Sequence, residues 1–178
     1  MRTRHVSRIV GAVALVLVVA GVASAADMPD AWVTMKTKVS LMTTEGLSAM
    51  DLNVDTVKGV VTLHGKVATE AEKARAETVA RGIDGAKEVK NLLQVVSSAQ
   101  REVVERSDDL IKKGIDDAFK ANRRVSTSGI TVASVNKGVV LLSGKTKSLE
   151  AHLEAVEVAN AVRGVRRVAT EVEVMPPS

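Results

Sequence analysis

The order of hydrophobic and polar residues predicts a hairpin of two strands in the first half of the chain. The first strand is expected near residues 51–57, and the second, residues 60–66, is nearly continuous in hydrophobic residues, as suits a central strand. Lys58 and Gly59 separate the two strands, and glycine accepts the positive φ that a tight hairpin turn requires. The two strands should therefore pair antiparallel.

A helix is predicted after this hairpin. Thr69 and Glu72 have the spacing of a capping box, in which a hydroxyl and a carboxylate satisfy the free amides of the first helical turn. The residues that follow have the spacing of one helical face: Ala76, Val79, Ala80 and Ile83. Since two of them are alanines, this helix can lie close to a sheet.

A third strand follows the helix, and its pattern is clearest near the end of the chain. Val168, Val172 and Val174 alternate there with Glu171 and Glu173, a period of two that indicates one covered face and one face that is wet or partnered. A right-handed crossover through the helix makes this strand parallel to the second strand.

The whole pattern occurs twice. Residues 130–135 and 139–145 repeat the hairpin around Asn136-Lys137-Gly138, with an offset of 78 before the turn and 79 after it. This difference predicts one extra turn residue in the second copy. The fold class is therefore α+β: two tandem αββαβ domains at 28–96 and 107–174, each a three-stranded mixed sheet with two helices on one face.

The first helix differs between the copies. In the second copy it carries a hydrophobic stripe: Ile111, Ile115, Ala118 and Phe119. The corresponding positions of the first copy are more polar: Val33, Thr37, Ser40 and Leu41. We therefore expect this helix to be less firmly packed and to turn another hydrophobic set inward: Trp32, Met35, Val39 and Met42. Trp32 either packs between helix and sheet, the favoured alternative, or anchors at a membrane interface.

Residues 1–25 are predicted to be a cleaved signal peptide. Three arginines precede an apolar run from Val10 to Val22, and Ala23-Ser24-Ala25 has the small residues that a signal peptidase requires. The run is shorter than the roughly 20 apolar residues that a spanning helix needs. Residues 97–106 form either a linker or, from Arg101, an extension of the next helix, and residues 175–178 are expected to be a disordered tail.

Composition and charge exclude several classes of function. Without the three leader arginines, 22 basic residues stand against 21 acidic ones, a balance that argues against a nucleic-acid binder. The chain has no cysteine, and therefore no disulfide, no thiol chemistry and no lipid-modified cysteine. His64 and His152 lie in different elements of different copies, which favours neither a catalytic nor a metal site. No cofactor is expected.

The basic residues are the remaining candidates for binding. Residues 97–178 carry a net charge of +2 and residues 26–96 a net charge of −1, so the second copy is the better candidate for contact with an anionic surface. Five cations near its strand ends are the candidate contacts: Lys145, Lys147, Arg163, Arg166 and Arg167. Scattered surface charge is the competing interpretation.

Six glycines have structural rather than chemical roles in this interpretation. Gly59 and Gly138 serve the hairpin turns, and Gly85 and Gly164 follow a helix C-terminus. Gly65 and Gly144 are expected to end the second strand, where the chain turns toward the helix.

Together these residues resemble the BON domain. The first copy carries the frame Asp30-Ala31-Trp32-Val33, Gly59-Val60-Val61-x-Leu63-x-Gly65-x-Val67 and Ile83-x-Gly85-x-x-x-Val89. The second copy carries Asp108, Gly138-Val139-Val140-x-Leu142-x-Gly144 and Val162-x-Gly164-Val165-x-x-Val168. The chain departs from the family at Thr37 and Ser40, and it lacks the lipoprotein cysteine of some relatives.

The resemblance implies a non-enzymatic protein exported to the periplasm and linked to osmotic or envelope stress. Its implied partners are anionic phospholipid surfaces or envelope proteins. The residues leave two functions open: a peripheral surface-binding protein, or a periplasmic chaperone or protein-interaction module that uses an open sheet face and a loosely packed first helix.

Overall fold

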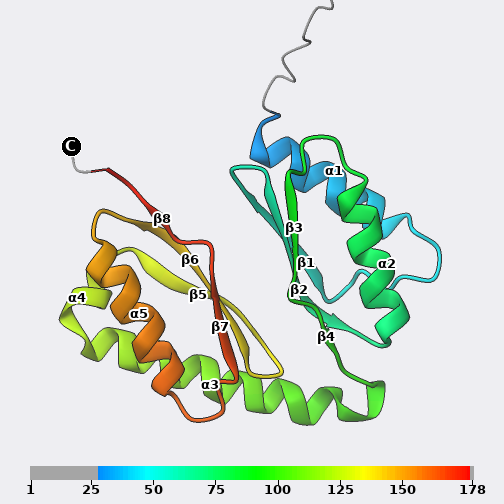
Figure 1. Ribbon diagram of the computed structural model, residues 1–178. Helices are drawn as coiled ribbons and strands as arrows, with labels where there is room; N and C mark the ends of the chain where they lie inside the picture. Colours follow the sequence, from blue (N-terminus) through cyan, green and yellow to red (C-terminus); the bar gives the residue numbers. More distant parts are fainter. Residues whose placement is uncertain (1–27, 177–178) are drawn as a thin grey trace, which may run out of the picture.

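The computed structural model describes residues 28–176 and contains two domains with the same order of elements (Figure 1). The first domain consists of α1 (Asp30–Met42), β1 (Leu52–Val57), β2 (Val60–Val67), α2 (Glu70–Arg81), β3 (Glu88–Asn91) and β4 (Gln94–Val95). A short turn, η1 (Ser98–Gln100), precedes the second domain. That domain consists of α3 (Arg101–Ala121), α4 (Arg123–Ser126), β5 (Ile130–Asn136), β6 (Val139–Thr146), α5 (Leu149–Ala161), β7 (Arg167–Thr170) and β8 (Glu173–Val174). The predicted signal peptide lies outside the described residues.

Each domain has the predicted mixed sheet. β2 pairs antiparallel with β1 and parallel with β3 and β4, which are two pieces of one interrupted strand. β6 pairs in the same way with β5 and with β7 and β8. The prediction of two tandem α+β domains is confirmed.

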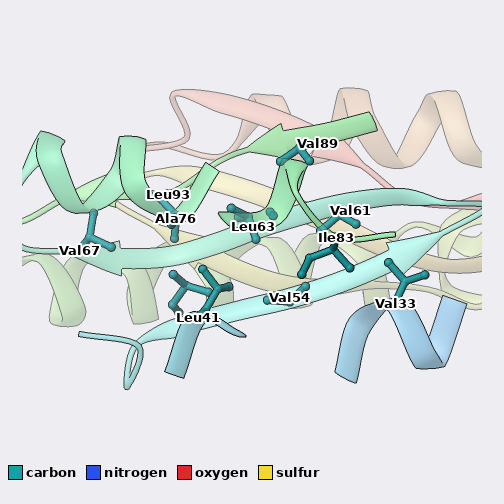
Figure 2. Packing of buried hydrophobic residues seen from close by; sticks show 12 residues of the cluster. Val33, Leu41, Val54, Val61, Leu63, Val67, Ala76, Ile83, Val89 and Leu93 are labelled. Atoms are coloured by element: carbon teal, nitrogen blue, oxygen red, sulfur yellow. The ribbon is translucent and has the colours of Figure 1, made fainter. Parts of the chain in front are cut away.

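The core of the first domain lies between the sheet and its two helices (Figure 2). Val61 and Leu63 of β2 are fully buried against Ala76 and Ala80 of α2, whose short side chains let the helix lie close to the strands. The hydroxyl of Thr69 accepts a hydrogen bond from the Glu72 amide at 3.1 Å, as the capping pattern predicts.

The expectation for α1 was wrong. Val33, Thr37 and Leu41 face the core, while Met35 and Val39 are 61% and 55% exposed. Thr37 can be fully buried because its hydroxyl donates to the carbonyl of Val33 at 2.7 Å, so no polar atom is left unpaired. The helix therefore keeps the same inward face as its counterpart α3.

The extra residue of the second copy does not lie in the turn. Both hairpins close with two residues, since Val57 pairs with Val60 and Asn136 pairs with Val139. The register of β5 instead shifts between Val132 and Ser134, where a bulge absorbs the insertion. A strand can take up an extra residue in this way, whereas a longer turn would change the pairing at the hairpin end.

Gly65 and Gly144 lie inside β2 and β6 rather than at their ends. Both have a positive φ, 122° and 126°. A Cβ on Gly65 would lie 1.9 Å from the carbonyl oxygen of Asp51, and one on Gly144 would lie 2.2 Å from that of Gly129. Glycine is required here because the backbone at the start of the paired antiparallel strand, at Asp51–Leu52 and at Gly129–Ile130, lies too close for a Cβ.

The segment between the domains is largely helical. α3 begins at Arg101, so residues 101–106 extend the first helix of the second domain, the second of the two alternatives for 97–106. At the other end, Met175 donates its amide to the Thr146 carbonyl at 2.7 Å, so the chain is still held to β6 at the start of the expected tail. Residues 177–178 lie outside the described residues.

Candidate functional site

The two sheets face each other. In Figure 1 the strands of both domains lie in the middle, with α1 and α2 on one outer side and α5 on the other. On the sheet faces away from these helices, Thr62 and His64 of β2 are 0% and 6% exposed, and Leu141 of β6 is 2% exposed. Because no helix of their own domain covers these side chains, the other domain does. The face expected to be wet or partnered is partnered at the central strands β2 and β6, while an open cleft lined by Asp55, Ala133 and Ser143 remains between the two sheets.

Charged and polar groups connect the domains at both ends of this interface. Lys58, in the first hairpin turn, lies 3.8 Å from the carboxylate of Glu173. Lys137, its counterpart in the second hairpin turn, donates to the Val95 carbonyl at 3.0 Å. Each hairpin turn therefore lies over the far end of the other sheet.

Two further ion pairs join the domains. The ammonium of Lys66 lies 3.2 Å from the carboxylate of Asp108, and both side chains are nearly buried. Arg101, at the start of α3, pairs with Asp51 in the loop before β1. A contact so rich in charges differs from the apolar core of a single domain and resembles a transient interface.

A cluster of titratable side chains lies in the middle of the interface. His64 Nε2 lies 2.8 Å from Asp55 Oδ2, and this hydrogen bond holds the pKa of the Asp55 carboxyl below its usual value. Glu171 of the second domain lines the same cleft, and burial raises its pKa. These three residues bring together groups from both domains.

The sequence did not single out this cluster, although one signal for it was present. Alternation along β2 places Thr62, His64 and Lys66 on the face away from Val61 and Leu63. Three polar residues in a central strand indicate a polar contact on that face. Their partners in the other domain could not be identified, since pairing between domains leaves no local pattern.

The five candidate surface cations fall into two groups. β6 and β7 are parallel, and Val139 at the start of β6 pairs with Arg167. Arg163, Arg166 and Arg167 therefore lie at one end of the sheet and Lys145 at the other, where it lies 3.3 Å from Glu173. Lys147 follows β6 and lines a shallow pocket with Lys145. The structure does not bring all five together.

The arginines in the loop before β7 and at its first residue are the more exposed group. All three are exposed, and none has an ion pair with another described residue. The only recorded hydrogen bond of these side chains within residues 28–176 runs from Arg166 to the Lys137 carbonyl at 3.5 Å. We call these residues, Arg163, Arg166 and Arg167, the arginine loop.

The outer face of α1 is hydrophobic and exposed. Met35, Val39 and Met42 repeat at helical spacing and are 61%, 55% and 73% exposed. Trp32 instead packs against the core of the first domain, with the Lys36 ammonium 4.6 Å from the centre of its ring. This is the packing role favoured from the sequence.

The candidates for metal binding in residues 28–176 are the histidines and the acidic side chains. No group of three or more histidine or acidic side chains in this range has the arrangement of a metal site. His64 and His152 lie in separate domains, and His152 contacts Thr170 at 2.8 Å. Within the same range, no helix combines the length and the hydrophobicity needed to cross a bilayer.

Comparison with known proteins agrees with the duplicated architecture. The chain is 30% identical over 147 residues to osmotically-inducible protein Y of Escherichia coli (strain K12), an alignment that covers 82% of this chain and 73% of that protein.

Two solved structures of CdsD, a structural protein of the type III secretion system of Chlamydia trachomatis, also match, one of them its C-terminal domain. Their sequence identities are 16% and 15% and their TM-scores 0.32 and 0.33. The alignments cover 84% and 85% of this chain, and 68% and 66% of those chains.

The family comparison separates the chain at the same place as the structure. The BON domain model matches twice, at residues 29–97 and 107–176, once for each αββαβ unit. Since the two matches cover more than half of the sequence and fall on the two folded units, the chain belongs to the BON domain family and carries two BON domains in tandem.

Proposed function

We propose that this protein is exported to the bacterial envelope, where it binds peripherally to anionic phospholipid surfaces as part of the response to osmotic stress. Residues 1–25 supply the sequence support for export. The relation to a protein named for its osmotic induction supports the link to osmotic stress.

The observation that carries the proposal is the arginine loop. Three guanidinium groups within five residues are exposed, and no described carboxylate neutralises them. Guanidinium groups bind phosphate oxygens through paired N–H donors, so this loop is suited to lipid phosphate groups. Lys145, by contrast, is already paired with Glu173 and is less available.

The expected binding free energy favours a weak and reversible attachment to the membrane. Each basic group close to an anionic membrane surface contributes about 1 kcal/mol. Three such groups therefore provide about 3 kcal/mol, enough to concentrate the protein at a surface but not to hold it irreversibly. The attraction should weaken as ionic strength rises, since salt screens exposed charges beyond about 10 Å at 0.1 M.

Co-sedimentation with vesicles tests the proposal. The chain without residues 1–25 is mixed with phosphatidylglycerol-containing vesicles or with pure phosphatidylcholine vesicles at low salt. We expect recovery with the anionic vesicles only. The variant R163Q/R166Q/R167Q should lose this recovery.

A matched control removes the same charge elsewhere. The variant R81Q/R106Q/K113Q neutralises three exposed cations that each pair with a carboxylate on their own helix. It should keep its recovery with anionic vesicles. An equal loss of vesicle binding in both triple variants would show that net charge, not the arginine loop, carries the attraction. Equal recovery of the wild-type protein with anionic and with phosphatidylcholine vesicles would refute recognition of anionic lipid.

The alternative function, a chaperone or protein-interaction module, has lost part of its basis. It depended on an open sheet face, and the central strands β2 and β6 are covered by the opposite domain. It also depended on a loosely packed first helix, and α1 is anchored by Val33, Thr37 and Leu41. The exposed hydrophobic face of α1 remains as one surface for such a partner.

A further inference from the structure

Three buried polar atoms in the domain interface make no hydrogen bond of ordinary geometry with another described residue. They are Thr62 Oγ1, His64 Nδ1 and Glu171 Oε1, and each exposes less than 1 Å² to solvent. Buried polar atoms are nearly always paired, and leaving one unpaired is costly. The atoms come from both domains, so this cost arises where the two sheets meet.

Glu171 is the member whose environment is least suited to a charge. Burial has the largest effect in raising its pKa, and the negative charge of Asp55 on β1 raises it further. The Thr62 hydroxyl on β2, which lies near the Glu171 carboxylate without ordinary hydrogen-bond geometry, lowers the pKa by less, as do His64 on β2 and Lys90 on β3. On its own side, Lys145 and Glu173 line the same cleft and form an ion pair with each other.

The two halves of the cluster respond differently to separation of the domains. Asp55 and His64 belong to the same hairpin of the first domain, so their 2.8 Å hydrogen bond persists if the domains separate. Glu171 belongs to the second domain, and separation would return its carboxylate to water. The Glu171 carboxyl is therefore the group whose proton affinity depends on docking.

We propose that docking of the two sheets is coupled to protonation of Glu171, so that acidification holds the domains together and a rise in pH loosens them. A proton can reach this cluster without opening the interface, whereas a larger ligand cannot contact atoms that are closed to solvent. A protonated Glu171 also gains an O–H donor for a buried neighbour, and it no longer repels Asp55.

The direction follows from linkage. A carboxyl with a higher pKa in the docked state binds its proton more tightly when docked, so docking is strongest at a pH below the ordinary value of 4.5. Docking weakens as the pH rises through 4.5 toward the raised pKa, and it changes no further above that value.

A distance measurement between the domains tests the proposal. The chain has no cysteine, so S48C/S126C places one spin label on each domain at exposed positions. Pulsed electron paramagnetic resonance then gives the distance distribution without lipid at about pH 4 and about pH 8, the lower value lying below the 4.5 at which the effect begins to weaken. We expect a single short distance at the lower pH and a shift toward longer distances at the higher pH.

Variants separate the cause from general effects of pH. E171Q, which is neutral and carries a donor, should keep the short distance at both pH values, whereas E157Q, an exposed change on α5, should behave like the wild type. Labels within the first domain, at S48C/E70C, should give one distance throughout. The proposal is wrong if the wild-type distribution is the same at both pH values, if E171Q keeps the wild-type response, or if the intradomain distance also changes. Because no lipid is present, the outcome is independent of membrane binding.

Discussion

The ammonium of Lys66 in the first domain lies 3.2 Å from the carboxylate of Asp108 in the second, in a contact from which solvent is nearly excluded. The same carboxylate accepts hydrogen bonds from the amides of Lys137 and Gly138 at 2.9 Å and 3.0 Å. Asp108 therefore fixes the hairpin turn of its own domain and pairs with a cation of the other.

Asp30 is the counterpart of Asp108 in the first domain, and it has the same contacts with a hairpin turn but no partner among the described residues of the other domain. It accepts hydrogen bonds from the amides of Lys58 and Gly59 at 2.7 Å and 2.8 Å, the same turn contacts in the first domain. No cation pairs with it among the described residues. The duplicated chain thus provides an internal comparison for the energetic role of Asp108.

The first prediction concerns Asp108→Asn. Removing one partner of a buried ion pair leaves Lys66 charged and unpaired, so the free energy of unfolding should fall by about 3–5 kcal/mol. Asp30→Asn only weakens charge-assisted turn contacts and should cost about 1–2 kcal/mol. Urea unfolding of the whole chain measures both.

A second substitution tests the cause of this loss. K66M removes the stranded charge, and the double variant D108N/K66M should recover part of the stability lost in D108N. An equal loss in D108N and D30N, with no recovery in the double variant, would show that the ion pair contributes nothing beyond the turn contacts.

The second prediction concerns Gly65→Ala. The added Cβ would overlap the Asp51 carbonyl at 1.9 Å, and the backbone φ of 122° is unfavourable for any L side chain. We expect a loss of at least about 2 kcal/mol in thermal or urea unfolding. Gly82→Ala is the control, because its nearest neighbouring atom is 3.5 Å away, and its effect should stay within about 1 kcal/mol. Similar losses at both positions would contradict a role for the close approach of the Asp51 backbone.

The third prediction concerns Thr37→Val. The Thr37 hydroxyl donates to a carbonyl that already belongs to the helix ladder, so its removal leaves no buried group unpaired. Valine has the same shape and is less costly to bury, and the free energy of unfolding should rise by up to about 1 kcal/mol. Thr37→Ser keeps the hydroxyl but loses a buried methyl group, and it should be destabilising by about 1 kcal/mol. A marked loss in the valine variant would mean that the hydroxyl is required by the fold.

The fourth prediction is a pH dependence that arises from Asp55. The hydrogen bond from His64 lowers the pKa of this carboxyl below its ordinary value of 3.8. The stability that it contributes is therefore fully present above 3.8 and is lost as the pH falls through the lowered pKa. Urea unfolding between about pH 4 and about pH 2 should show a smaller acid-induced loss in D55N than in the wild type. D109N, a change at an exposed aspartate, should follow the wild type, and an unchanged slope in D55N would contradict the assignment.

Local pattern accounts for the success of the fold prediction. The face formed by Ala76 and Ala80, the Thr69 cap and the hairpin glycines all depend on contacts within a few residues or on periodicity. Such features are present in the sequence itself. The errors came at residues whose role depends on a specific contact. The Thr37 hydroxyl bonds to a helix carbonyl, and Gly65 lies where the backbone of the paired strand leaves no room for a Cβ.

The sequence by itself determined the two αββαβ units, their order and their helix and strand faces, because each unit's apolar periodicity matches the period of the element that it forms. Only the tertiary structure decided that the two polar sheet faces cover each other, that His64 and Glu171 share one interface, and that the candidate cations divide between two ends of a sheet. These relationships depend on the packing of segments far apart in the chain, and side chains that meet across a domain boundary have no fixed spacing in the sequence.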